Sequence, residues 1–216
     1  MYGNKEQEKY IDAETLKKLL MKGDEDEFMT GGGVITMTPN NHIYFYCDVL
    51  PDSVLKLNNV LVQMMKESLS EAATKGRTPD PIHLHIQSNG GLVSAGFIGY
   101  DVITEINKFV DIHTHIDGYA ASAATLLSVA GKKRFMTPSS TVLIHELSTY
   151  IGGKLSEITN EYANCKLIEN KLEEIYLRHT KFEKEELQEL LKKDVLLDAE
   201  KALEKSLVDE IKTVIF

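Results

Sequence analysis

One serine of the chain lies in a stretch of small residues that could hold a nucleophile. Residues 118–124 read Gly-Tyr-Ala-Ala-Ser-Ala-Ala, and they join an apolar segment at 110–116 to an Ala-rich segment that ends at Gly131. A strand-to-helix turn of this kind would let a substrate backbone approach Ser122 and would offer free helix N–H groups to a developing oxyanion. Close packing of a helix against a strand would also favour the small residues of 118–122, so other residues must support the chemistry.

A histidine follows the serine in a second apolar segment. His145 lies in Val-Leu-Ile-His-Glu, residues 142–146, which is typical of a strand. Serine alone is a weak nucleophile and needs a general base within hydrogen-bond reach, and a strand would hold the imidazole rigidly. A lone histidine in an apolar strand can also be a core residue. If Ser122 and His145 meet in the fold, the pair predicts covalent acyl-transfer chemistry.

The elements that must position these residues alternate along the chain. The expected strands are 82–87, 110–117, 134–138 and 141–147, and the expected helices between them are 94–109 and 122–130. Such alternation predicts parallel strands joined by right-handed crossovers, with ligands at the carboxyl ends of the strands. Ser122 and the pair Gly90-Gly91 both fall at such ends, which supports a site there.

Two later segments bear on the site and on assembly. Residues 156–179 predict one long amphipathic helix, and its apolar stripe could cover the sheet or contact another subunit. The stripe comprises Ile158, Tyr162, Cys165, Ile168, Leu172, Ile175 and Tyr176. Asp194 lies in the link between the next two predicted helices, where a carboxylate could orient a histidine. Asp198 is a rival for that role, although it can also cap the last helix.

The order of these segments resembles the Clp protease proteolytic subunit, the ClpP family. The resemblance runs from about Ile43 to Ile211 and includes Gln-Ser-Asn-Gly-Gly at 87–91, the serine and histidine segments, and Asp-Ala-Glu-Lys-Ala at 198–202. It implies an α/β, ClpP/crotonase-like fold of repeated ββα units, with residues 156–179 as a protruding handle helix. The family has a proline where this chain has Asn89, and residues 145–153 form a longer segment than in the family.

The resemblance also implies the roles of the site residues. By position, Ser122 is the nucleophile, His145 the base and Asp194 the acid of a catalytic triad. The backbone N–H groups of Gly91 and Ala123 form the oxyanion hole. The residues that line an extended substrate are Leu92, Val93 and Leu147.

The predicted function is a serine endopeptidase that hydrolyses unfolded polypeptides within an oligomeric ring chamber. The resemblance implies a homo-oligomer, either a heptameric ring or a doubled ring, and leaves open docking to an AAA+ unfoldase. The chain itself needs no cofactor, and ATP would enter only through such a partner. The alternatives are a non-catalytic ring subunit, a Ser–Lys enzyme of the signal-peptide-peptidase kind with Lys132 or Lys133 as base, and a weaker option, an acyl-CoA hydratase on the same fold.

Composition bounds the remaining possibilities. A chain of 216 residues with 43% hydrophobic residues fits one domain, 34–216, preceded by an arm at 1–33 that resembles nothing in the family. The net charge of -9 argues against nucleic acid as a partner, and no apolar run is long enough to predict a membrane span. Only two cysteines and a polar N-terminus favour a reducing, cytoplasmic location.

Four further histidines alternate with apolar residues in two predicted strands. They are His83, His85, His113 and His115. If the strands are neighbours, four imidazoles share one sheet face and could bind zinc. A flat face gives poor tetrahedral convergence, and no cysteine or carboxylate belongs to the repeat. We therefore predict a half-buried polar layer under a helix and no metal site.

Overall fold

The computed structural model describes residues 34–38 and 41–213, all within one compact unit, Gly33–Phe216. The predicted arm, 1–33, lies outside the described residues, so the proposed domain boundary stays a prediction. The elements of the first half are β1 (Val34–Thr38), β2 (His42–Tyr46), α2 (Pro51–Lys75), β3 (Ile82–Ser88), α3 (Val93–Ile106), β4 (Ile112–Ala121) and α4 (Ala124–Val129). Those of the second half are β5 (Lys133–Met136), β6 (Thr141–Leu143), α5 (Leu155–His179), α6 (Lys184–Leu191), β7 (Leu196–Leu197), α7 (Ala199–Glu204) and β8 (Glu210–Ile211).

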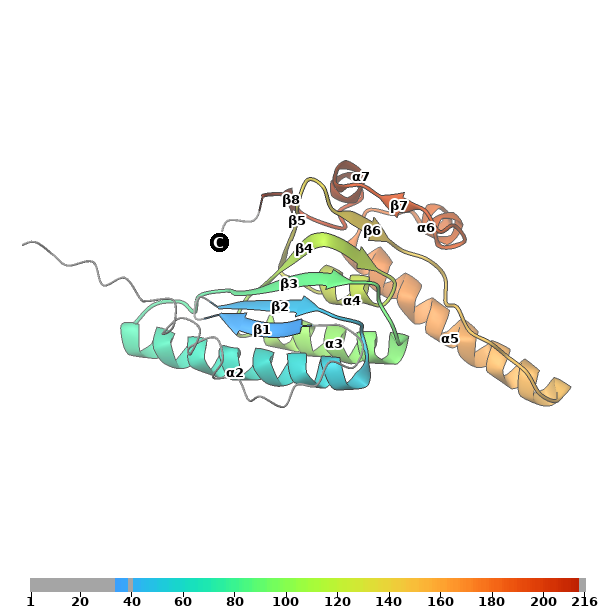
Figure 1. Cartoon of the computed structure of the whole chain (residues 1–216), viewed down its shortest axis with the longest axis horizontal. Helices are drawn as coiled ribbons and strands as arrows, with labels where there is room; N and C mark the ends of the chain where they lie inside the picture. Colours follow the sequence, from blue (N-terminus) through green and yellow to red (C-terminus); the bar gives the residue numbers. More distant parts are fainter. Residues whose placement is uncertain (1–33, 39–40, 214–216) are drawn as a thin grey trace, which may run out of the picture. The chain divides into compact units, whose positions relative to one another are not determined.

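The strands form one sheet in the order β1-β2-β3-β4-β5-β8 (Figure 1). Strands β2 to β5 pair in parallel, as the alternation of strands and helices predicts, and β1 is antiparallel to β2. The long strand β4 changes partner along its length, because residues 113–116 pair with β5 and residues 119–121 pair with β6. The carboxyl ends of β4 and β6 therefore lie side by side.

Helices α2 and α3 cover one face of this sheet, as Figure 1 shows. Alternate strand residues such as Ile43 and Leu84 point into that layer, where they pack in the core with Leu57 and Leu61 of α2 and Ile103 of α3, and all five are 0% exposed. Burial of a leucine or isoleucine side chain contributes about 1.5–3 kcal/mol, so this layer supplies much of the free energy of folding.

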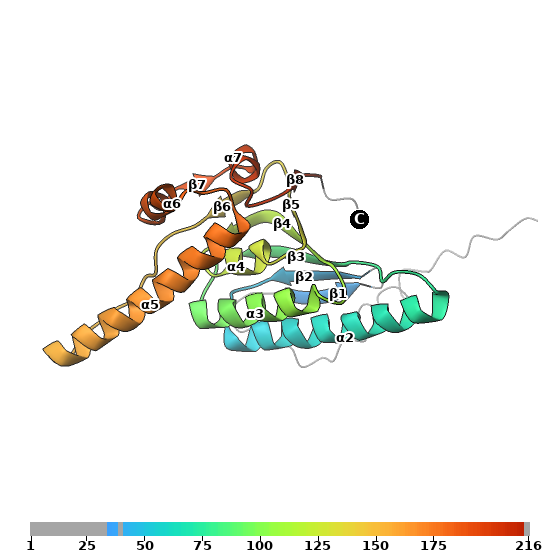
Figure 2. The ribbon, with the colours of Figure 1, turned by 180° about the vertical axis from the view of Figure 1, so that it is seen from behind.

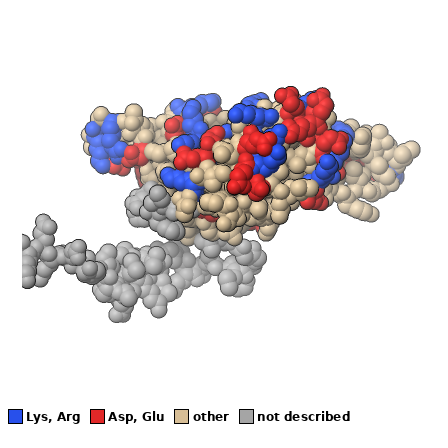
Figure 3. Space-filling view, turned by 90° about the horizontal axis from the view of Figure 1, so that it is seen from above, with Lys and Arg blue, Asp and Glu red and all other residues tan. Residues whose placement is uncertain are grey.

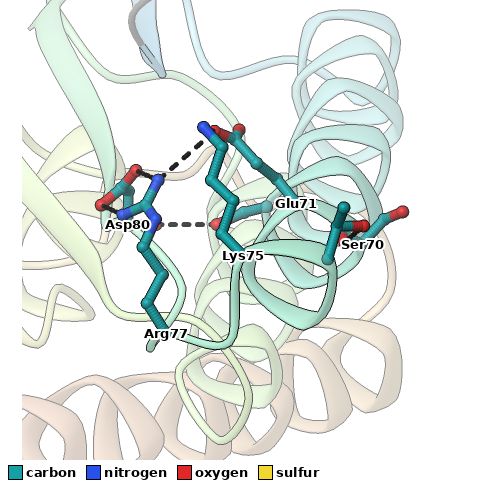
Figure 4. Close-up of polar contacts among 7 residues, drawn as sticks. Ser70, Glu71, Lys75, Arg77 and Asp80 are labelled. Atoms are coloured by element: carbon teal, nitrogen blue, oxygen red, sulfur yellow. Dashed lines mark hydrogen bonds and ion pairs between the residues drawn. The ribbon is translucent and has the colours of Figure 1, made fainter.

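The turn that joins α2 to β3 is held by charged side chains (Figure 4). Helix α2 ends at Gly76, whose φ of 60° is left-handed and whose N–H donates to the Ala72 carbonyl. Arg77 then donates to Asp80 at 2.6 Å and to Glu71 at 3.3 Å, and Lys75 pairs with Glu71. These contacts direct the chain from the end of α2 into β3.

Arg134 fastens the C-terminal part of the unit to the sheet. Its guanidinium donates to both carboxylate oxygens of Asp209, at 3.0 and 2.6 Å, and to the His179 carbonyl at the end of α5 at 2.7 Å. A cation at a helix C-terminus is favoured by the carbonyls that lack partners there. One side chain thus joins β5 to α5 and to the link before β8.

Helix α5 projects from the rest of the unit, as Figure 2 shows. Only its last part is buried, through Leu172, Ile175 and Tyr176. The first half exposes large apolar side chains, and the strongest case is Leu155 at 80%. In Figure 3, charges of both signs are mixed over the visible face, whereas the tip where α5 begins is mainly uncharged. No helix of the described residues is long and apolar enough to cross a membrane.

Two expected boundaries beside Ser122 and His145 differ in the structure. Strand β4 extends to Ala121, and α4 begins only at Ala124, so Ser122 stands between strand and helix and not inside a helix. Strand β6 ends at Leu143, so His145 follows the strand instead of lying within it. At Ser122 the small residues that extend a sequence pattern form a turn, and at His145 the chain continues without regular secondary structure.

Candidate active site

Ser122 occupies a strained turn between β4 and α4. Its φ is 54°, a left-handed value that a residue with a Cβ adopts at a cost of about 1–3 kcal/mol. The Ser122 N–H donates to the Leu143 carbonyl of β6 at 2.9 Å, and the Ser122 carbonyl accepts from the Thr125 N–H at 3.0 Å. A sharp strand-to-helix turn of this kind is also where α/β-hydrolases hold their nucleophilic serine.

A bend in β4 brings the serine to that position. Gly118 has a φ of 90°, and its N–H donates to Ser140 Oγ at 2.6 Å. Ser140 Oγ in turn donates to the Ile116 carbonyl at 3.0 Å. The bend separates the part of β4 that pairs with β5 from the part that pairs with β6, and it directs Ser122 to the end of β6.

The glycine pair after β3 packs directly against the serine turn. A Cβ at Gly90, whose φ is 93°, would lie 2.6 Å from both the Ala121 carbonyl oxygen and Ser122 Cβ. A Cβ at Gly91 would lie 2.4 Å from the Val49 carbonyl oxygen. Only glycine fits either position. The Gly90 N–H donates to Ser88 Oγ at 3.1 Å, which holds the turn in shape.

Two backbone N–H groups remain available at this contact. Among the described residues, neither the Gly91 N–H nor the Ala123 N–H donates a hydrogen bond. The Ala123 nitrogen lies 3.1 Å from the place where a Cβ of Gly90 would be. Two free donors beside a serine hydroxyl are what an oxyanion hole requires.

The register of β6 and β7 brings the predicted base and acid to the same end of the sheet. Antiparallel pairing matches Val142 with Leu197 and Leu143 with Leu196. If that register continues past the ends of the two strands, His145 falls opposite Asp194. The Glu146 N–H donates to the Leu191 carbonyl at 2.7 Å, which holds the segment after His145 against the end of α6.

The single chain does not complete a hydrogen-bonded triad. Among the described residues, no hydrogen bond joins the side chains of Ser122, His145 and Asp194, and Asp194 is exposed. Catalytic hydrogen bonds are often long in a ligand-free enzyme and tighten with substrate. Asp198, the alternative candidate for the acid, caps α7 by accepting from the Lys201 N–H at 2.8 Å.

Comparisons with known proteins give the family and the fold of the chain. The family model described as Clp protease matches residues 56–214. The chain belongs to the Clp protease family. A solved structure of a ClpP1 mutant from Listeria monocytogenes is similar to this Clp protease family member, with a TM-score of 0.68 and 22% sequence identity, over 80% of this chain and 91% of that chain. The resemblance and the α/β, ClpP-like fold predicted from the sequence are confirmed.

The fold of this Clp protease family member separates the candidate lysine bases from the serine. Lys133 pairs in register with His113 at the beginning of β4, whereas Ser122 follows the end of that strand. At about 3.3 Å per residue, the strand between them spans roughly 25 Å. Lys133 instead forms an ion pair with Glu210 at 2.9 Å. The geometry does not bring Lys132 or Lys133 to Ser122.

The predicted substrate-lining residues flank the glycine turn and the histidine. Leu92 directly follows Gly91 and is 52% exposed, and Val93 begins α3. Leu147 is half-buried in the segment that follows His145. No strand is present at Leu147, so the structure gives no edge for an extended peptide there, and these three assignments stay predictions.

A layer of imidazoles lies on the other face of the sheet. His83 pairs in register with His113, and His85 with His115, so the predicted sharing of one face is confirmed. Helices α2 and α3 do not cover this layer, because they pack on the opposite, apolar face of the sheet. A cover by another helix stays a prediction. The polar layer is closed by its own neighbouring rings: His85, only 1% exposed, stacks on His115 at 4.5 Å and on Tyr44 at 4.6 Å.

Four members of this layer on β2 and β4 were not predicted from the sequence: His42, Tyr44, Tyr46 and Asp117. Asp117 Oδ2 lies 2.6 Å from His85 Nδ1 and accepts from the Tyr46 hydroxyl at 2.8 Å. His42 Nδ1 lies 2.8 Å from His85 Nε2, which continues the chain of polar contacts. The signal was present in the strict alternation of His42, Tyr44 and Tyr46 in β2.

Desolvation favours the neutral form of four histidines of this layer. Burial, followed by the neighbouring histidines, lowers the pKa of His83 to about 4 and that of His115 to about 2. The pKa values of His42 and His113 are lowered for the same first reason. Among the described residues, no group of three or more His, Cys, Asp or Glu is arranged to hold a metal ion.

Proposed function

We propose that this chain is a serine endopeptidase of the Clp protease type that hydrolyses unfolded polypeptides. The observation that carries the proposal is the strained turn of Ser122, with a φ of 54°, packed against Gly90 beside the two free N–H groups of Gly91 and Ala123. A residue with a Cβ stays in such a conformation only where its surroundings hold it there, and such strain clusters at functional sites.

The proposed reaction is acyl transfer in two steps. Ser122 Oγ attacks the peptide carbonyl carbon while His145 takes the hydroxyl proton, and the N–H groups of Gly91 and Ala123 stabilise the oxyanion. His145 then gives that proton to the leaving amine, and the C–N bond breaks. Water attacks the resulting ester with His145 again as base, which releases the carboxylic acid and restores Ser122. Asp194 orients the imidazole and stabilises its charged form.

The exposed apolar face of α5 supports an oligomeric enzyme. Leu155 is 80% exposed, Tyr162 59% and Ile158 38%, and their spacing puts them on one side of the helix. An apolar helix face of this kind favours contact with a partner. We propose a homo-oligomeric ring, heptameric or doubled, that encloses the sites. Docking to an AAA+ unfoldase and a cytoplasmic location are further expectations from the family.

A non-catalytic ring subunit is the second candidate. The observation in its favour is that Asp194 is exposed and makes no hydrogen bond with His145 in the described residues. Such a subunit would keep the fold and the α5 surface and would lack a nucleophilic serine.

A fluorophosphonate probe distinguishes the two candidates. We expect the assembled wild-type protein to be labelled at Ser122, and Ser122→Ala and His145→Ala to abolish labelling. Ser139→Ala is the matched control, because Ser139 is an exposed serine in a turn away from the site, and it should be labelled like the wild type. Labelling of another serine, or no labelling of an assembled sample, would contradict the peptidase.

A further inference from the structure

A buried chain of hydroxyl groups connects α5 to the serine turn. The Tyr176 hydroxyl lies 2.6 Å from Thr125 Oγ1, and Thr125 Oγ1 donates to the Ser122 carbonyl at 2.6 Å. Thr125 is 0% exposed and Tyr176 only 3%. Because the single Thr125 hydroxyl proton goes to the Ser122 carbonyl, the Tyr176 O–H must donate to Thr125 Oγ1. Burial raises the pKa of Tyr176 to about 12, so this donor keeps its proton at neutral pH.

The Ser122 carbonyl, which ends this series of hydrogen bonds, belongs to the peptide group that also carries the Ala123 N–H. The Ser122 C=O and the Ala123 N–H lie in one rigid plane and point in opposite directions. A side chain that holds the carbonyl therefore also sets the direction of the Ala123 N–H. That N–H is the donor proposed for the oxyanion.

The carbonyl side of this plane is held by the hydroxyl and the N–H of one residue, Thr125. Helix α4 has only 6 residues, so it is too short to impose its geometry on the turn that precedes it. The Ser122 carbonyl accepts from the Thr125 N–H at 3.0 Å and from Thr125 Oγ1, and both donors belong to one residue. Thr125 is in turn in contact with the Tyr176 hydroxyl, which belongs to the buried end of α5.

We infer that Thr125 and Tyr176 are positioning residues that aim the Ala123 N–H at the oxyanion. Neither side chain touches the substrate; Tyr176 orients Thr125, and Thr125 orients the peptide group. The inference rests on the proposed peptidase function. It connects the packing of α5 to the geometry of the Ser122 turn through two hydrogen bonds.

The expected kinetic effect is on kcat, because an oxyanion donor acts in the transition state and not on the bound substrate. Loss of a whole oxyanion donor costs about 10²–10³-fold in kcat. Thr125→Val keeps the side-chain shape and the Thr125 N–H contact, so we expect a smaller loss of about 10-fold. Tyr176→Phe acts one step further away and should lose about 3-fold. KM should stay unchanged in both variants, and Thr125→Ser, which keeps the hydroxyl, should restore kcat.

Tyr100→Phe is the matched control. Tyr100 is also a buried tyrosine, 5% exposed, and its hydroxyl also contacts a residue of α5, at 2.8 Å from His179 Nε2. That contact does not lead to the serine turn. Tyr100→Phe should therefore lower the thermal stability about as much as Tyr176→Phe and leave kcat unchanged.

The experiment measures kcat and KM on a short fluorogenic peptide, the Tm, and hydrogen exchange of the peptide that spans residues 118–124, all on the full assembled chain. Faster exchange of this segment in Thr125→Val and Tyr176→Phe, but not in Tyr100→Phe, is expected together with the loss of kcat.

Wild-type kcat with only a lowered Tm would overturn the inference and leave the peptidase intact. If Thr125→Val does not fold, the comparison of Tyr176→Phe with Tyr100→Phe decides. A wild type that neither turns over peptide nor reacts with the probe would overturn the proposed function, and unchanged exchange would then overturn the inference separately.

Discussion

At the scale of single residues, the candidate site depends on backbone geometry as much as on side-chain chemistry. The Ser122 backbone has a left-handed conformation, and a Cβ at Gly90 would collide with Ser122. Both positions therefore restrict which residues fit. Gly91 and Ala123, whose N–H groups we propose as oxyanion donors, directly follow the two residues of this contact. A substitution at a glycine can therefore disable the serine without touching it.

Gly90→Ala tests this dependence. Its Cβ would lie 2.6 Å from a backbone oxygen, so the serine turn must move, and we expect stability to fall and probe labelling of Ser122 to drop about 100-fold. Gly76→Ala is the control, because Gly76 is also left-handed at a φ of 60° but has nothing within 4 Å of a Cβ. It should cost only about 1–2 kcal/mol and leave labelling unchanged. Equal labelling of both variants would contradict the predicted contact.

The assignment of the acid is a second test at this scale. Asp194→Asn should leave fold and assembly intact and reduce peptide turnover about 10⁴-fold, as when the acid of a well-studied serine protease is replaced. Asp198→Ala should remove the cap of α7, at a cost of about 0.5–2 kcal/mol, with little loss of rate. Steady-state kinetics and thermal unfolding of both variants check this. An inactive Asp198→Ala beside an active Asp194→Asn would show that the acid is misassigned.

At the scale of elements, the two faces of the sheet have different chemistry. One face is apolar and covered by α2 and α3, and the other carries a continuous layer of rings from β2 to β5. The layer closes through stacking of its own side chains and through the contacts of Asp117 with His85 and Tyr46. Its charged surroundings are Asp111 and Lys133 near His113, and Lys212 near both His83 and His113.

The layer predicts a loss of stability in mild acid. The folded-state pKa values of His83, about 4, and His115, about 2, lie below the usual value of 6.5, so the unfolded chain binds protons first as the pH falls. Stability is thus fully present above about pH 6.5 and decreases below it, toward the folded-state values. We expect the Tm to fall by several degrees between about pH 6.5 and 5, before most carboxylates are protonated. His115→Gln should weaken this dependence, and a constant Tm over that range would contradict the neutral layer.

At the scale of the whole molecule, α5 exposes an apolar surface that the described residues of a single chain do not cover. Its last part anchors it to the body through Tyr176 and its neighbours, while its first half exposes Leu155, Ile158 and Tyr162. The same helix thus carries the surface proposed for assembly and the residue inferred to position the serine turn.

Charge on that surface should oppose assembly. Ile158→Glu together with Tyr162→Glu places two like charges within an apolar contact, so we expect smaller assemblies at micromolar concentration, measured by light scattering or mass photometry. Glu161→Gln, at an exposed position of the same helix, should assemble like the wild type. A wild type that is a stable monomer would contradict the proposed ring, and unaltered assembly of the double variant would show that α5 is not the contact.

Local patterns in the sequence determined the α/β class, the alternation of strands and helices, the long α5 and the family. These features depend on periodicity and on short motifs, which neighbouring residues carry by themselves. The same patterns placed Ser122 and Gly90-Gly91 at the carboxyl ends of strands, where the structure has them. They misjudged the ends of β4 and β6, because small and apolar residues suit a strand, a helix or a tight turn equally well.

Only the tertiary structure decided which residues meet. The contact of Gly90 with Ser122, the antiparallel register of β6 with β7, and the hydroxyl chain from Tyr176 to Thr125 join segments far apart in the sequence. The side of the sheet that α2 covers was decided in the same way, because it depends on the hand of the crossovers and on packing of the whole core. No local pattern encodes such distances, since they follow from how the strands pair and bend together.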